Sequence, residues 1–126
     1  MIITRRVQAW AVAHQIDIKG DLRTSKYYPA DQSRSKRPAW WVHVPLDKLD
    51  SVEYFEVFCE KAVETDDFYH LKIPATYFKE NQAKFYTTNS KISVWLSAAK
   101  DDIFRDSHPK GHHLDFGRFV SSRSHK

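Results

Sequence analysis

Apolar and polar residues alternate in four short segments, and this pattern limits what the chain can fold into. The segments are Trp40–Pro45, Tyr54–Glu60, Phe68–Pro74 and Lys91–Ala98. Alternation with a period of two is typical of β-strands with one face on a core. Pro45 and Pro74 close the first and third segments, since proline cannot continue a strand's hydrogen-bond ladder. The sequence therefore predicts a sheet built from these four strands.

The alternation also predicts which side chains face inward. One set in each segment is apolar, and the residues expected to face the core are Trp40, Val42, Val44, Phe55, Val57, Cys59, Tyr69, Leu71, Ile73, Ile92, Val94, Leu96 and Ala98. Trp41 and His43 would share the opposite face of the first strand, as would Glu56, Phe58 and Glu60 on the second.

Helices are expected beside the strands. Residues 75–85 predict a helix, because Ala75, Phe78, Gln82 and Phe85 roughly share one face. Two interpretations of the N-terminal region remain open: a helix over Arg5–Gln15, or a strand near residues 10–18. A helical turn is expected at 101–105, and residues 114–120 would return to the core.

These elements predict an α+β fold with a mostly antiparallel or mixed sheet of about five strands, one main helix and a short C-terminal helical segment. A length of 126 residues favours one domain. We divide it into a basic N-terminal segment (1–39), a sheet-helix core (40–120) and a frayed tail (121–126).

Composition excludes several classes of protein. The chain has three glycines and no GxGxxG or GxxxxGK[ST] motif, which excludes those two phosphate-binding loops. Its single cysteine cannot form an internal disulfide. No apolar run approaches the roughly 18 residues of a membrane span, and the N-terminus does not resemble a signal peptide. We expect a soluble, cytoplasmic protein.

Charge is unevenly distributed along the chain. Residues 1–40 hold eight Lys/Arg and three Asp, residues 41–99 hold six Lys/Arg and nine Asp/Glu, and residues 100–126 hold six and four. Basic side chains mixed with aromatic ones suit phosphate contacts and base stacking, so we expect DNA or RNA as a partner. The residues expected to bind nucleic acid are Arg23, Lys26, Arg34, Lys36, Arg37, Tyr27, Tyr28, Trp40 and Trp41.

Asp17 and Lys19 form a D-x-K triplet with its two charged residues two positions apart. On an extended strand both side chains project from one face. A carboxylate that holds Mg²⁺ beside a lysine near the attacking water is an arrangement suited to phosphodiester cleavage. The alternative is the polar face of an edge strand.

Residues 16–120 resemble the second half of PD-(D/E)XK nuclease-like proteins. The resemblance rests on the order of the segments WWVHVP, YFEVFC, YHLKIPATYF and LDF after the D-x-K triplet. It implies that Asp17 and Lys19 match the catalytic D/E-x-K positions, with Mg²⁺ as cofactor in an active enzyme. The family's other metal-binding aspartate precedes the triplet, but residues 1–16 contain no acidic residue. Asp21, Glu56 or Glu60 would have to replace it, or the protein is a degenerate relative that still binds nucleic acid.

Two further groups of residues suggest chemistry. His108, His112 and His113 could supply imidazole ligands to zinc, although an exposed loop is the more common outcome of such a cluster. Cys59 could pair with His43 or His70 as a nucleophile, or be an inert core thiol.

The acidic segment 53–67 suggests a second class of function. It could bind a partner protein through charge and exposed aromatic rings, or be a solvated strand face. The leading hypothesis is thus a small nucleic-acid-interacting protein with a nuclease-like core, either metal-dependent or degenerate. The alternative is a protein–protein interaction module, such as an inhibitor or accessory subunit from a mobile element or a phage defence system.

Overall fold

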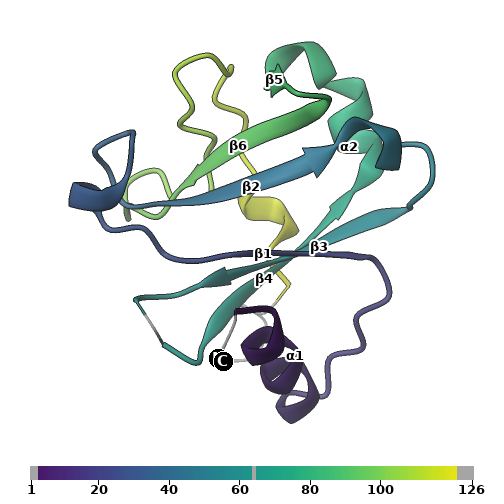
Figure 1. The fold of residues 1–126 in the computed structure, drawn as a ribbon, viewed down its shortest axis with the longest axis vertical. Helices are drawn as coiled ribbons and strands as arrows, with labels where there is room; N and C mark the ends of the chain where they lie inside the picture. The colour runs from purple at the N-terminus through teal and green to yellow at the C-terminus, as the bar shows by residue number, and fades with distance from the viewer. Residues whose placement is uncertain (1–2, 64, 122–126) are drawn as a thin grey trace.

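The computed structural model describes residues 3–63 and 65–121 (Figure 1). Within them the elements are α1 (Ile3–Ala13), β1 (Asp21–Ser25), η1 (Ala30–Gln32), β2 (Ala39–Pro45), η2 (Leu46–Lys48), β3 (Tyr54–Glu60), β4 (Phe68–Pro74), α2 (Ala75–Glu80), η3 (Gln82–Lys84), β5 (Tyr86–Thr88), β6 (Lys91–Ser97) and η4 (Gly117–Phe119), where η marks a 3-10 helix. Apart from Ser121, the predicted frayed tail lies outside the described residues.

The strands form two three-stranded sheets rather than one. In sheet A, β1 runs parallel to β3, and β3 pairs antiparallel with β4. In sheet B, β6 lies between β2 and β5 and is antiparallel to both. The predicted α+β class is confirmed, and the described residues contain six strands where about five were expected.

The main core lies between the two sheets. All the residues predicted to face inward lie in this core or pack against it, so the four alternating segments are confirmed as strands. Trp40 illustrates how the sheets are joined. Its ring stacks on Phe104 with 5.4 Å between centroids, and its Nε1 donates to the Glu60 carbonyl oxygen of sheet A at 2.6 Å. A buried indole N–H usually finds an acceptor in this way.

A second, smaller core covers the other face of sheet A. Helix α1 lies on the side of this sheet away from sheet B (Figure 1) and packs Val7 and Trp10 against Phe58 and Phe68. Trp10 contacts both phenylalanine rings edge-on, with centroids 6.1 and 5.8 Å away. Sheet A therefore packs against a core on both faces, whereas α1 does not lie on sheet B.

The structure corrects some predicted boundaries. The N-terminal region is a helix over residues 3–13, and residues 10–18 do not form a strand. The helix predicted over 75–85 ends at Glu80 and continues as a 3-10 turn to Lys84. Residues 101–104 form turns and a bend, Arg105 forms a bridge with Asp115, and the C-terminal helical segment lies instead at 117–119.

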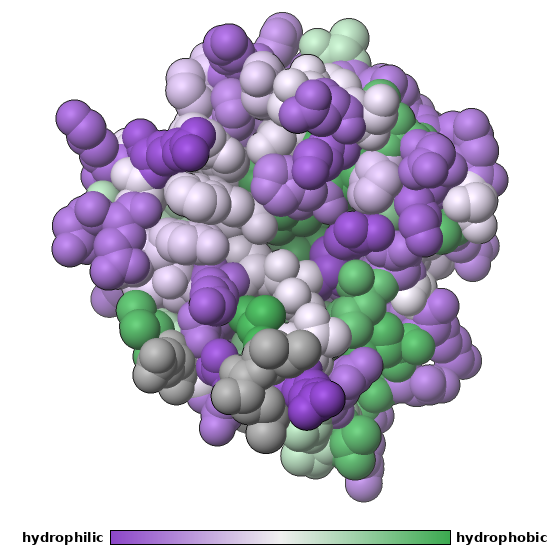
Figure 2. Space-filling view, viewed as in Figure 1, coloured by the Kyte–Doolittle hydropathy of each residue, from purple (hydrophilic) through white to green (hydrophobic). Residues whose placement is uncertain are grey.

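Hydrophilic residues cover much of the face drawn in Figure 2, and hydrophobic residues form smaller areas between them. Within the described residues, none of the helices has the length and apolar character needed to cross a bilayer.

Candidate functional site

The outer face of sheet B carries a group of aromatic and polar side chains. Because strand residues alternate between faces, Trp41 and His43 point away from the core that Trp40, Val42 and Val44 fill. Register places Trp41 opposite Trp95 and His43 opposite Ser93. On the other side of β6, Tyr86 pairs with Ser93. The sheet thus holds these side chains in two neighbouring rows.

Five rings form a continuous row on this face, which we call the aromatic row. Its members in order are Tyr28, Trp41, Trp95, His108 and Tyr86. The centroids are 4.2 Å apart from Tyr28 to Trp41, 4.2 Å from Trp95 to His108, and 4.4 Å from His108 to Tyr86. The widest step is between Trp41 and Trp95, whose centroids lie 6.1 Å apart at an interplanar angle of 33°.

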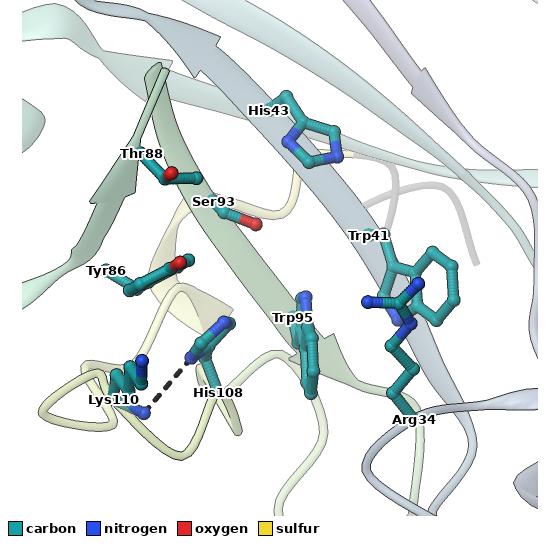
Figure 3. Close-up of a pocket in the computed structure, with 9 residues that line it drawn as sticks. All are labelled: Arg34, Trp41, His43, Tyr86, Thr88, Ser93, Trp95, His108 and Lys110. Carbon is teal, nitrogen blue, oxygen red and sulfur yellow. Dashed lines mark hydrogen bonds between the residues drawn. The ribbon is translucent and has the colours of Figure 1, made fainter. Parts of the chain in front are cut away.

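A cavity of about 450 Å³ opens over the aromatic row and is shown in Figure 3. This size falls within the range of small-molecule sites. Two cations, Arg34 and Lys110, lie at its margin, and the residues that line it include no carboxylate. Lys110 Nζ lies over the Tyr86 ring, 5.2 Å from its centroid. We call this the sheet B cavity. Its lining is Arg34, Trp41, His43, Tyr86, Thr88, Ser93, Trp95, His108 and Lys110.

The loop after β6 places His108 in the cavity wall. Its Nδ1 lies 3.0 Å from the Lys110 backbone nitrogen and accepts that N–H, so the hydrogen of the neutral ring is on Nε2. Asp106 holds the start of the loop, since one of its carboxylate oxygens accepts the backbone N–H groups of Trp95 and His108 at 3.2 and 3.1 Å. Burial raises the pKa of Asp106, an effect these two bonds oppose.

The two histidines of the cavity favour their neutral forms. Burial lowers the pKa of His43, and the nearby charges of Lys91 and Arg23 lower it further. Burial lowers the pKa of His108, and the charge of Lys110 acts in the same direction. At neutral pH the positive charge of the cavity therefore comes from Arg34 and Lys110.

The predicted basic residues divide into two groups. Arg23 bonds to Asp21 at 2.5 Å, and Arg37 bonds to Asp101 and Asp102 at 2.9 and 3.0 Å. The other three are exposed, and no acidic side chain of the described residues forms an ion pair with them: Lys26, Arg34 and Lys36. Only this second group has charge available for phosphates.

The predicted stacking residues also separate. Trp40 is only 1% exposed and packs in the main core, so the prediction that it stacks on bases is wrong. Tyr27 is half-buried and contacts Trp40 edge-on. Tyr28 and Trp41 stack on each other in the aromatic row. Alternation along the strand separates the two adjacent tryptophans, because Trp40 faces the core and Trp41 faces solvent.

The residues around Asp17 do not fit a magnesium site. Asp17 and Lys19 are about four-fifths exposed, lie outside any strand and approach each other at 3.9 Å. The acidic residues that could complete the site already bind protein groups, since Asp21 pairs with Arg23 and Lys48, and Glu60 with Arg6. Glu56 Oε2 accepts the backbone N–H groups of Lys19 and Gly20 at 2.7 and 2.5 Å.

The histidine loop does not gather ligands for zinc either. His108 is buried between rings, whereas His112 and His113 are exposed. In residues 3–63 and 65–121, no three His, Cys, Asp or Glu side chains are grouped as metal ligands. Cys59 is fully buried in the main core, and His43 and His70 lie on other faces of the sheets.

The acidic segment 53–67 is not a solvated strand face. Glu56 and Glu60 are each 2% exposed and lie on the face of sheet A that α1 covers. Arg6 of that helix donates to Glu60 at 2.7 Å, to Asp66 at 3.0 Å, and also to the Thr65 carbonyl oxygen. Glu56 and Glu60 are therefore not available to a partner protein, whereas Glu53 and Asp66 remain exposed.

A chain of hydrogen bonds links Ser121, His70 and Glu56. The Ser121 hydroxyl lies 2.9 Å from His70 Nδ1, and His70 Nε2 lies 2.9 Å from Glu56 Oε1. Nucleophilic triads contain the same residue types. Here, however, the Ser121 backbone N–H also donates to the His70 carbonyl oxygen at 2.8 Å, and Ser121 does not line the sheet B cavity. We therefore assign these bonds to holding the C-terminal segment on β4.

Sequence reasoning missed much of the sheet B cavity. Tyr86, Thr88, Ser93, Trp95 and Lys110 were not among its predicted binding residues, although the alternation of β6 already placed Ser93 and Trp95 opposite the core-facing set. The short strand β5 carries Tyr86 and Thr88 and has no apolar alternation that would reveal it.

A comparison with protein-family models finds no match, and comparisons with curated proteins and with solved structures find no significant match.

Proposed function

We propose that this protein binds single-stranded nucleic acid on the outer face of sheet B. The observation that carries the proposal is the aromatic row beside a cavity with two cations and no carboxylate. Aromatic side chains bind the faces of bases, and cations bind the phosphates that join them. Duplex DNA or RNA hides its base faces in the stack, so the row suits a single strand.

Each part of the cavity has a role in this proposal. A base stacks over Trp41 and Trp95 in the cavity, while Arg34 and Lys110 contact the flanking phosphates. His108 offers an N–H from Nε2 to an acceptor on the base or sugar, because its Nδ1 is already bonded to the Lys110 N–H. Ser93 and Thr88 add hydroxyl groups to the same wall.

Cleavage is not part of this proposal, because Asp17 and Lys19 are exposed outside any strand, and Asp21, Glu56 and Glu60 are already bound to protein groups. The proposal also differs from the protein–protein alternative, which relied on an acidic surface at residues 53–67. Two of the carboxylates in that segment, Glu56 and Glu60, are buried.

Fluorescence anisotropy with labelled oligothymidylate and oligouridylate tests the proposal. Arg34→Ala and Lys110→Ala should each weaken binding and reduce the slope of log K against log salt by about 1. Arg5→Ala is the matched control, since Arg5 is an exposed cation on α1, which packs on sheet A. Absence of binding at low salt, or equal losses in all three variants, would overturn the proposal.

A further inference from the structure

A second cavity adjoins the aromatic row at its Tyr28 end. It has a volume of about 670 Å³ and is lined by Arg6, Lys26, Tyr27, Tyr28, Gln32, Glu60 and Val63. We call it the Tyr28 cavity. Tyr28 lines this cavity, while its stacking partner Trp41 lines the sheet B cavity. The stacked pair therefore stands between two cavities.

The position of this pair is fixed by the backbone on both sides. Tyr28 and Ala39 exchange two backbone hydrogen bonds, each 2.9 Å long, which join the segment after β1 to the first residue of β2. The backbone N–H of Trp41 donates to the Ser25 hydroxyl at 2.9 Å. Two rings held 4.2 Å apart at an interplanar angle of 17° thus form a rigid link between the cavities.

The lining of the Tyr28 cavity carries charges of both signs, and its two cations differ in their partners. The Arg6 guanidinium is engaged by two carboxylates, Glu60 and Asp66, so Arg6 has no charge available for a phosphate. Lys26 is exposed and forms no ion pair with the acidic side chains of the described residues. Its ammonium group is therefore the available cation in this cavity, as Arg34 and Lys110 are in the other.

We infer that the two cavities form one binding path, and that the ligand is a single strand several nucleotides long that crosses the Tyr28–Trp41 pair. This inference rests on the proposed function and names its ligand class more closely. A mononucleotide would fill only the sheet B cavity. A strand of about four nucleotides or more, the lower end of known single-strand site sizes, would place phosphates near Arg34 and Lys26 together.

The test compares oligothymidylates of two and eight nucleotides in fluorescence anisotropy at one fixed salt concentration. Lys26→Ala should weaken binding of the eight-nucleotide strand by roughly three- to tenfold and leave the dinucleotide unchanged, because only the longer strand reaches Lys26. Lys110→Ala should weaken binding of both. A longer strand offers more positions at which the protein can bind, which raises its apparent affinity. This effect is the same for each variant and for the unmodified protein, so the ratio of their affinities is free of it.

A second measurement uses Tyr28→Leu, which removes the stacking ring but keeps an apolar side chain. This substitution should weaken binding of the eight-nucleotide strand more than binding of the dinucleotide. Circular dichroism confirms that the variant keeps its fold. An eight-nucleotide strand that binds Lys26→Ala and the unmodified protein equally would overturn the inference, and so would equal affinity for a duplex of the same length. If Lys110→Ala still weakens binding in that case, the proposed function stands without the extended path; if no oligonucleotide binds at all, the proposed function fails.

Discussion

Glu56 accepts a hydrogen bond from His70 at 2.9 Å, and both side chains are buried in sheet A. The other oxygen of Glu56 accepts two backbone N–H groups from the segment that joins α1 to β1. One buried carboxylate therefore connects three parts of the chain: β3, β4 and the segment before β1.

Replacing this carboxylate should destabilise the protein. Glu56→Gln introduces an amide NH₂ where the carboxylate accepted hydrogen bonds, so at least one buried donor loses its partner. We expect the free energy of unfolding to fall by about 1–3 kcal/mol. Urea unfolding measures it, and Glu53→Gln at an exposed neighbouring position is the control. Equal midpoints for the two variants would contradict this role of Glu56.

Stability should fall as the pH is lowered from 7.5 to 5.5. Burial lowers the pKa of His70 in the folded state, an effect that its hydrogen bond to Glu56 opposes. Below a pH of about 6.5 the unfolded chain therefore binds more protons than the folded protein. The stability that is present above this pH is lost as the pH falls toward the lowered pKa of the folded state. The pKa values of His43 and His108 are also lowered, so these residues change stability with pH in the same direction.

Urea unfolding of the unmodified protein and of His70→Gln at both pH values isolates the contribution of His70. The variant should lose less stability between pH 7.5 and 5.5, since it has no imidazole to protonate at this position. Asp106 also contributes to the pH dependence of stability, but it is present in both proteins, so its contribution drops out of the difference between them. An unchanged pH dependence in His70→Gln would refute the assignment, and His112→Gln at an exposed site serves as the control.

Gly20 permits a close approach between two segments. A Cβ at this position would lie 2.6 Å from the Tyr54 carbonyl oxygen, and backbone cannot move aside as a flexible side chain can. Gly20→Ala should therefore lower the free energy of unfolding by about 1–3 kcal/mol. In the control Gly117→Ala, the nearest atom is an oxygen of the Asp115 side chain at 3.3 Å. Thermal melts should show a clearly larger decrease for Gly20→Ala, and similar decreases would argue against the close approach.

Cys59 should not react with thiol reagents in the folded protein. Its side chain is fully buried in the main core, and burial raises the pKa of the thiol, which disfavours the reactive thiolate. Labelling with iodoacetamide should be slow in buffer and become rapid in concentrated urea. Rapid labelling of the native protein, measured by mass spectrometry, would show that this part of the core opens readily.

The fold could be predicted from the sequence where burial leaves a periodic pattern. Ile92, Val94 and Leu96 alternate with Ser93 and Trp95, and that alternation identified both β6 and its core face. Strand β1 has no such pattern in its sequence DLRTS and owes its conformation to its pairing with β3. Tertiary contacts of this kind are not visible in a local window of sequence.

The candidate site was harder to predict for a related reason. The sequence shows that Trp40 and Trp41 face opposite ways, but the face that meets solvent depends on which layers cover the sheet. Glu56 and Glu60 illustrate the reverse problem, because an acidic run suggested exposure while the fold buries both side chains. His108 was expected in an open loop, and only the fold places it between Tyr86 and Trp95.

The pairing of β1 with β3 has a consequence for how the chain folds during its synthesis. A ribosome produces β1 well before its parallel partner β3, and β2 well before β6, its neighbour in sheet B. Neither sheet can close on strands that are adjacent in sequence alone, so much of the chain must emerge before either core forms. Pairing between distant strands slows folding and prolongs the exposure of apolar surface. The nascent N-terminal half should therefore depend on chaperones more than a simple meander of the same length would.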